Sequence, residues 1–513
     1  MKISQLKLGA LLSYVTLLLS NIIGIIYTPI MLRLMGQSEY GLYSLVASVV
    51  GYLTVLDMGL GNAIIRYIAK YRAIGDKEEE YSLNGMFLIL YTAIGIVVAA
   101  IGILLSFNVK RIFGTNLSLI ELEKAQVMMV LLVFNLAVSF PLGIFGSIMT
   151  AYEKFIFPKV VNIIRVLINP CIMIPLLLMG YKSVTMVVVT TLLNLMCLLL
   201  NMWYCFNKLK IRILFKKYNW SILKDISSYS FFIFLNIIVD KIYWSTDQFI
   251  LGMVSGTVSV AIYTVASQLN AYYMNFSTAM SGVFLPKITV MVSQGSSDEE
   301  LSDMFIKIGR LQYILLAFIL SGFILFGKQF IGIWAGEQYQ QAFYMALVIM
   351  IPLTIPLIQT LGITILQAKN MHAFRSNMYA AIAIINIVIS INLAKVWDGF
   401  GCALATGISM LIGHFVIMNI YYHKKVKLQI LMFWKEIFKL TVPVFIAMLG
   451  GLMIKVLISE QEILSLGISI VLFSLLYLGL MWRIGMNEYE KGLFSVLIKA
   501  ICKRGKTLII DKE

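Results

Sequence analysis

The residues with the most chemical potential lie in one apolar stretch, residues 230–252. One face of the helix that this stretch predicts carries polar and aromatic side chains at i, i+4, i+7 and i+11 spacing: Asn236, Asp240, Tyr243 or Trp244, and Asp247. An ionised side chain at the middle of a bilayer costs on the order of 3 kcal/mol. Because of that cost, this face predicts the wall of a polar cavity and not a surface turned to lipid.

Two carboxylates and one ammonium group supply the charges of this face. We interpret Asp240 and Asp247 as sites for a proton or a cation, and Lys241 as a site for an anionic substrate group. Adjacent residues of a helix point about 100° apart, so Asp240 and Lys241 cannot fully neutralise each other. The alternative interpretation is a salt bridge between them that fixes helix packing, and the sequence leaves it open.

A second polar face lies on residues 160–180, where Arg165 and Asn169 follow helical spacing. Arg165 either binds a phosphate or extends its side chain to the membrane interface. We assign both residues to the substrate cavity, together with the uncharged Asn21 of the first apolar stretch. Asp57 and Arg66 flank a glycine-containing segment, where the two side chains either pair as a cytoplasmic gate or merely cap a helix end.

Composition excludes most other classes of protein. Of 513 residues, 60% are hydrophobic and 13% are charged, whereas soluble proteins average about 25% charged residues. There are three histidines and five cysteines, and no cysteine has a CxxC partner. We therefore expect neither a metal site nor a disulfide framework, and no bound cofactor.

The apolar stretches predict an all-α, polytopic membrane protein of about fourteen transmembrane helices, since a span needs about 20 apolar residues. We place the spans at residues 10–31, 40–60, 83–106, 125–148, 160–180, 183–205, 230–252, 258–284, 311–329, 340–361, 376–394, 400–421, 440–458 and 463–482.

Lysine and arginine indicate the orientation. With both termini in the cytoplasm, 31 of the 41 basic residues face inward, 8 face outward, and Arg165 and Lys241 lie within spans. Cytoplasmic loops carry such an excess. This distribution also explains the net charge of +16 without nucleic acid as a partner.

The spans suggest four parts of the chain. Residues 1–206 form a six-helix lobe, 207–229 a cytoplasmic loop, 230–423 a second six-helix lobe, and 424–513 two additional helices with a basic tail. An offset of 220 residues pairs Gly36 with Gly256 and Tyr43 with Tyr263, as parallel halves of a transporter would.

The segment from Leu34 to Tyr43, followed by Asp57-Met58-Gly59-Leu60 and Arg66, resembles the Wzx-type polysaccharide flippases. These belong to the multidrug/oligosaccharidyl-lipid/polysaccharide (MOP) exporter superfamily. The resemblance implies a MATE-like two-lobe architecture in the bacterial cytoplasmic membrane. It implies transport of an undecaprenyl-diphosphate-linked oligosaccharide by alternating access, coupled to H⁺ or Na⁺. The implied partners are this polyprenyl-linked glycan, membrane lipids, and a glycan polymerase with other assembly proteins.

Two alternatives within the superfamily are lipid II export and multidrug export. The first predicted helix carries no charged residue within its span. The lipid II flippases of the superfamily, which resemble this chain in topology, carry charged residues within their first helix. A membrane-embedded glycan polymerase or ligase is a more distant alternative. Such enzymes usually have a large outer loop that carries catalytic groups, whereas the predicted outer loops of this chain are short. We therefore do not expect an enzyme.

Overall fold

The computed structural model describes residues 5–215, 220–369, 371–458 and 463–495, which form helices with no strand among them. The α-helices are α1 Gln5–Met35, α2 Gln37–Leu53, α3 Leu60–Ile74, α4 Lys77–Phe113, α5 Leu119–Ala151, α6 Ile156–Leu178, α7 Ser183–Asn207, α8 Trp220–Val254, α9 Thr257–Ser293, α10 Asp298–Trp334, α11 Gln341–Ile358, α12 Thr360–Ala368, α13 His372–Met410, α14 Asn419–Lys424, α15 Ile430–Leu457 and α16 Ile463–Leu480. Short 3₁₀ segments cover Thr54–Asp57 and Glu337–Tyr339, and π-helical segments cover Leu411–Met418 and Met481–Gly485.

Eleven segments of the described residues are long and apolar enough to span a membrane. In addition, α8 and α9 cover the predicted spans 230–252 and 258–284. One of the eleven segments, Ala373–Lys424, contains two predicted spans, because Asp398 leaves helical geometry (φ 49°, ψ −135°) between them. The prediction of an all-α membrane protein with about fourteen spans is therefore confirmed.

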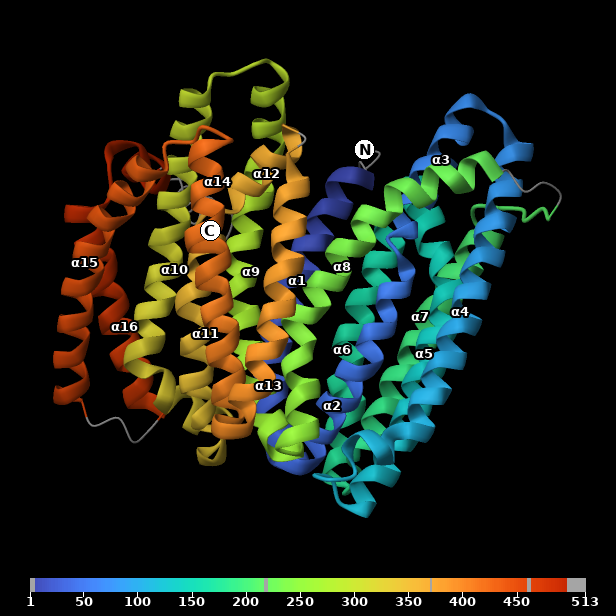
Figure 1. Ribbon diagram of the computed structural model, residues 1–513, viewed down its shortest axis with the longest axis horizontal. Helices are drawn as coiled ribbons and strands as arrows, with labels where there is room; N and C mark the ends of the chain where they lie inside the picture. Colours follow the sequence, from blue (N-terminus) through green and yellow to red (C-terminus); the bar gives the residue numbers. More distant parts are fainter. Residues whose placement is uncertain (1–4, 216–219, 370, 459–462, 496–513) are drawn as a thin grey trace, which may run out of the picture. The chain divides into compact units, whose positions relative to one another are not determined.

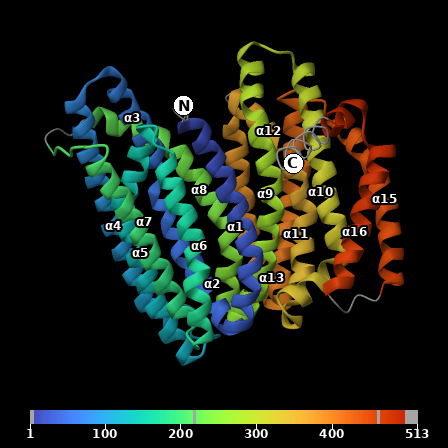
Figure 2. The same cartoon turned by 180° about the vertical axis from the view of Figure 1, so that it is seen from behind.

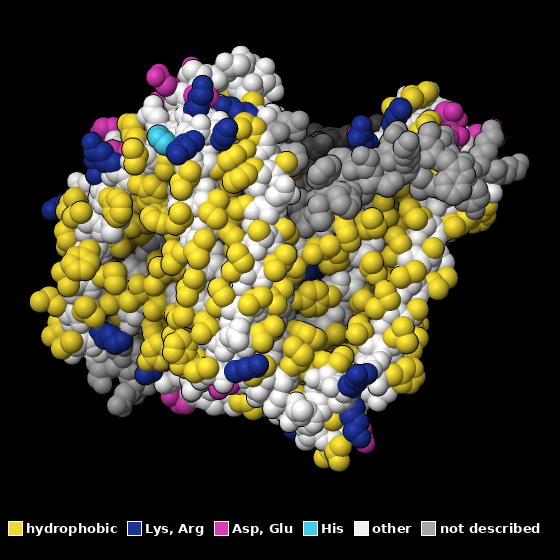
Figure 3. All heavy atoms as spheres, in the orientation of Figure 1, with side chains coloured by type: hydrophobic (Ala, Val, Ile, Leu, Met, Phe, Trp, Pro, Cys, Tyr) yellow, Lys and Arg dark blue, Asp and Glu magenta, His cyan; other side chains and the backbone are white. Residues whose placement is uncertain are grey.

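The helices turn apolar side chains outward, as a membrane protein must. On α4, Ile96, Leu104 and Phe107 are 65%, 63% and 72% exposed. On the face drawn in Figure 3, hydrophobic side chains cover the middle of the helices, and charged side chains gather near the helix ends. Apolar side chains on this scale would be unfavourable in water, so these surfaces face lipid.

The chain divides into two compact units. The first unit comprises Met1–Val265 and Tyr379–Ala405, and the second comprises Ala266–Met378 and Thr406–Glu513. Their bounds differ from those of the predicted six-helix lobes, which stay a prediction. Within the predicted cytoplasmic segment 207–229, α8 begins at Trp220.

In the first unit, α4 packs along α5, α5 along α7, and α1 along α6 (Figures 1 and 2). Glycine allows α2 to approach the start of α9 closely: a Cβ on Gly41 would lie 1.8 Å from the carbonyl oxygen of Thr257. Small residues permit such backbone contact between membrane helices. A hydrogen bond between the hydroxyls of Tyr52 and Thr246 also joins the first unit's α2 to α8.

The two glycines paired by the 220-residue offset have the same local role. Gly36 has φ +81° and directly precedes α2, and Gly256 has φ +84° and directly precedes α9. Non-glycine residues rarely adopt these angles. The paired sequences therefore begin equivalent helices with equivalent turns.

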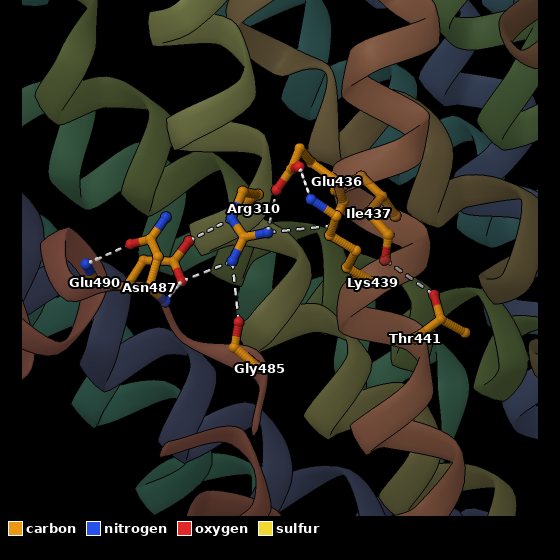
Figure 4. A network of polar contacts seen from close by, with 8 residues as sticks. All are labelled: Arg310, Glu436, Ile437, Lys439, Thr441, Gly485, Asn487 and Glu490. Carbon is orange, nitrogen blue, oxygen red and sulfur yellow. Dashed lines mark hydrogen bonds and ion pairs between the residues drawn. The ribbon is translucent and has the colours of Figure 1, made fainter. Parts of the chain in front are cut away.

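The second unit contains a buried charge cluster, the Arg310 cluster (Figure 4). Arg310 of α10 binds Glu490 in a bidentate pair, with Nε to Oε1 at 2.7 Å and Nη2 to Oε2 at 3.0 Å. Its Nη1 donates to Glu436 of α15 at 2.8 Å, and its Nη2 donates to the carbonyl of Gly485 at 3.0 Å. Arg310 and Glu490 are 4% and 1% exposed. The cluster holds α10, α15 and the segment after α16 together.

Candidate functional site in the first unit

The side chains of the predicted polar face of α8 do not share one environment. Asp240 is exposed, whereas Lys241 is half-buried and directed at α2, with its Nζ 3.8 Å from the position that a Cβ on Gly51 would occupy. The choice between a substrate site and an internal salt bridge for Asp240 and Lys241 stays a prediction.

The two aromatic residues of this face, Tyr243 and Trp244, are at least half-buried in the first unit. Tyr243 is buried, with its ring 6.5 Å from that of Tyr379, and Trp244 is half-buried. The side chain of Asn236 lies outside the described part of the chain.

Asp247 is enclosed by oxygen-bearing side chains from two other helices. It is 2% exposed and accepts hydrogen bonds from the hydroxyl of Tyr263 on α9 and from Ser390 on α13, the latter at 3.0 Å. The Ser390 hydroxyl also lies 3.4 Å from the Oδ1 atom of Asn386, and both residues are buried. A buried carboxylate needs such partners. The cluster has the chemistry to hold a proton or a small cation.

Arg165 of α6 lies at the start of a chain of side-chain amides. Its Nη1 donates to the Oδ1 atom of Asn194 on α7 at 3.1 Å. The amide nitrogen of Asn194 in turn donates to Asn135 at 2.8 Å and to Ser139 at 2.9 Å, both on α5. These contacts fix the Asn194 amide, so that its oxygen faces the guanidinium group.

The amides line a cavity of about 390 Å³, here called the amide cavity. Its walls are Tyr43, Ala47, Val50, Gly51, Thr54, Leu132, Asn135, Leu136, Ser139, Arg165, Thr190 and Asn194. Gly51 lies in this wall, and the ammonium group of Lys241 lies beside Gly51, although Lys241 is not among the residues that line the cavity. Arg165 thus lines the amide cavity, whereas Lys241, which is 76 positions away in the sequence, lies beside one residue of its wall.

Two further cavities share walls with the amide cavity. The α1–α6 cavity, of about 330 Å³, shares Arg165 and Thr190 with it, and also contains the predicted Asn169. The Asp57 cavity, of about 220 Å³, shares Thr54, Leu136 and Ser139 with it. Asn21 of α1 is half-buried and is not among the residues that line these cavities.

Asp57 and Arg66 do not pair in the described part of the molecule. The carboxylate of Asp57 accepts a hydrogen bond from the hydroxyl of Tyr91 at 2.9 Å, and the exposed Arg66 lies 5.9 Å from the ring centre of Tyr67. The two residues sit on opposite sides of a helix break, where Gly59 has φ +71°. Their role as a gate stays a prediction.

Several residues of the site could not be singled out from sequence. Asn135, Ser139 and Asn194 are single uncharged residues in otherwise apolar stretches, with neither a charge nor a repeating pattern to draw attention to them. Asn386 and Ser390 do follow i, i+4 spacing, which was the available signal. Among the described residues no group of three or more His, Cys, Asp or Glu side chains could hold a metal ion.

The first unit thus offers cations, amides and hydroxyls inside membrane-spanning helices. A ligand with anionic and hydroxyl groups would match these walls, because guanidinium and ammonium groups bind oxyanions and amides exchange hydrogen bonds with hydroxyls. An apolar ligand would leave them unsatisfied.

Known proteins resemble this chain over most of its length. A family model described as "Polysaccharide biosynthesis protein" matches residues 7–292. A Shigella flexneri protein named as a proposed O-antigen transporter is 23% identical over 316 residues, which make up 60% of this chain and 71% of that protein.

Two solved structures show the fold. The lipid II flippase MurJ in an inward closed conformation superposes with a TM-score of 0.71 at 16% identity, covering 92% of this chain and 98% of MurJ. An inward-facing multidrug resistance MATE family transporter of the MOP superfamily gives a TM-score of 0.61 at 15% identity, covering 79% and 95%. The predicted MATE-like architecture is therefore confirmed.

Proposed function

The chain belongs to the polysaccharide biosynthesis protein family, and on this premise we propose that it is a flippase for a polyprenyl-diphosphate-linked glycan. Its membership supports the resemblance to Wzx-type flippases that the sequence motifs indicated. The relatives named above are transporters or flippases, so we propose transport by alternating access and not catalysis.

The observation that carries this proposal is the amide cavity, which Arg165 lines and which has the ammonium group of Lys241 beside its wall residue Gly51. A glycan diphosphate has many polar groups, and each one left unsatisfied in hydrocarbon costs several kcal/mol. Arg165 and Lys241 supply positive charge for the diphosphate, and Asn135, Ser139 and Asn194 supply partners for hydroxyls. The polyprenyl tail stays in the lipid that the apolar helix surfaces face.

Asp247 is our candidate for energy coupling. A site that carries one elementary charge across a membrane gains about 2.3 kcal/mol per 100 mV. The carboxylate is buried beside the hydroxyls of Tyr263 and Ser390, so binding H⁺ or Na⁺ there would remove a buried negative charge. Asp240 is exposed in this structure, which favours Asp247 over Asp240 for this role.

The charge distribution supports a proposal for the orientation of the chain in the membrane. The basic residues favour both termini in the cytoplasm, and we propose the bacterial cytoplasmic membrane as the location. The glycan polymerase that consumes the flipped product would be a neighbouring partner in that membrane.

The test is the amount of surface glycan made by the bacterium with variants of the two cations. We expect Lys241→Met and Arg165→Gln each to lower surface glycan at least tenfold, because a hydrogen bond to a charged group contributes about 1.5–3 kcal/mol. The matched control is Lys70→Met, an exposed lysine on α3 outside the cavities. Immunoblots of membranes check that each variant is inserted.

Normal surface glycan in both cavity variants would refute the proposal. Complementation separates the alternatives within the superfamily. If the wild-type chain restored growth to cells depleted of their lipid II flippase and left surface glycan unchanged, lipid II would be the substrate instead.

A further inference from the structure

Some polar atoms in the wall of the α1–α6 cavity have no hydrogen-bond partner among the described residues. It is lined by Ser20, Ile23, Gly24 and Tyr27 from α1, Arg165, Val166, Asn169 and Pro170 from α6, and Thr190 and Leu193 from α7. Two polar atoms in this wall, the hydroxyl of Tyr27 and the Oδ1 atom of Asn169, are buried and have no hydrogen-bond partner among the described residues. Tyr27 is only 9% exposed.

Buried polar atoms without partners are rare, and each costs about 1–3 kcal/mol. Two of them on facing helices of one cavity therefore indicate a ligand that completes them. A volume of about 330 Å³ is at the small end of the range for ligand sites. It suits one ring-sized group and not an oligosaccharide.

The chemistry of the wall narrows the ligand further. Asn169 presents an acceptor, and so does Thr190, whose hydroxyl already donates to the carbonyl of Met186 at 2.8 Å. A fully ionised phosphate has no donor for such acceptors. A ligand that matches this cavity therefore carries hydroxyl or amide N–H groups as hydrogen-bond donors. Next to them it carries an acceptor for the guanidinium group of Arg165, which only donates hydrogen bonds.

A sugar attached to a diphosphate has this combination. Arg165 and Asn169 are one helical turn apart, about 6 Å on the same face of α6, so they can contact neighbouring groups of one molecule. We propose that the α1–α6 cavity is a subsite for the sugar adjoining the diphosphate. Arg165 binds the anionic side, and Asn169 and Tyr27 bind hydroxyl or N–H groups of the ring. This inference rests on the proposed function and adds recognition of the sugar to it.

The experiment compares two probes bound to the full-length protein in detergent. One probe is a short-chain polyprenyl diphosphate without sugar, and the other is the same diphosphate carrying a single hexose. We expect Tyr27→Phe and Asn169→Leu each to weaken binding of the hexose probe about tenfold, and to change binding of the sugarless probe less than twofold. Arg165→Gln should weaken binding of both probes.

A matched control is available on α7. The Oδ1 atom of Asn201 is also buried without a partner, but Asn201 does not line the cavity. Asn201→Leu should leave both affinities within twofold of wild type. Melting temperatures of the variants verify that each one is folded, and Tyr27→Phe removes a single oxygen atom.

The outcomes separate the two levels of the argument. If Tyr27→Phe and Asn169→Leu weaken both probes equally, or weaken neither, the subsite is refuted while the flippase function stands. If the wild-type protein binds neither probe, the proposed function fails, and the subsite fails with it.

Discussion

Removing Arg310 tests how much the second unit depends on its buried charge cluster. In the variant Arg310→Met, Glu490 keeps a carboxylate that is 1% exposed and loses its cation. Breaking a buried ion pair from one side costs about 3–5 kcal/mol. We expect a loss of this size in the free energy of unfolding, because the variant also removes the bonds to Glu436 and to the Gly485 carbonyl.

The assay is denaturant unfolding of the detergent-solubilised protein, followed by tryptophan fluorescence. Lys439→Met is the matched control: this lysine also binds Glu436, but its side chain is 59% exposed. Exposed pairs contribute about 0–1 kcal/mol, so the control should stay within 1 kcal/mol of wild type.

A second variant isolates the unpaired charge as the cause. Arg310→Met combined with Glu490→Met removes both buried charges, and replacing a whole buried pair by apolar residues is often neutral. The double variant should therefore recover at least half of the loss. If Arg310→Met costs no more than the control, or if the double variant is less stable than Arg310→Met alone, the reasoning is wrong.

Three further predictions concern the first unit and the topology. Gly36 has φ 81° and ψ 168°, a conformation that costs other residues about 1–3 kcal/mol. Gly36→Ala should therefore lower the free energy of unfolding by this amount in the same assay. The control Gly146→Ala, which has open space around its Cβ position, should be neutral or stabilising. Gly41→Ala should lower stability by about 1–3 kcal/mol, because its Cβ would lie 1.8 Å from the Thr257 carbonyl oxygen; an unchanged unfolding midpoint would contradict the close packing of α2 and α9. In a cysteine-free background, an impermeant thiol reagent applied to intact cells should label Tyr181→Cys and not Lys208→Cys, and the reverse pattern would overturn the orientation.

Hydropathy alone located the helices, because each span must bury about 20 apolar residues in lipid whatever its neighbours are. It even located the break inside α13, where Lys395, Trp397 and Asp398 interrupt the apolar run. It could not place the start of α8, since Trp220 begins a helical segment of mixed polarity.

The candidate site was partly predictable for a different reason. A charge inside a span is costly, so Arg165, Lys241 and Asp247 stood out one by one. Their partners did not, because Ser390 is 143 residues from Asp247 and Asn194 is 29 residues from Arg165. No local pattern links such pairs, and only the packing of helices decides which uncharged residues meet a charge.

The Arg310 cluster also has a consequence for how the chain is made. Glu490 follows Arg310 by 180 residues, and ribosomes add about 5–20 residues per second. The guanidinium group is therefore synthesised roughly 9–36 s before its main counter-ion. Until Glu436 is made, the newly made chain carries an unmatched cation at a position that is buried in the folded unit. The segment after α16 carries Glu490 and completes the cluster, so a chain that ends before Glu490 lacks the bidentate pair.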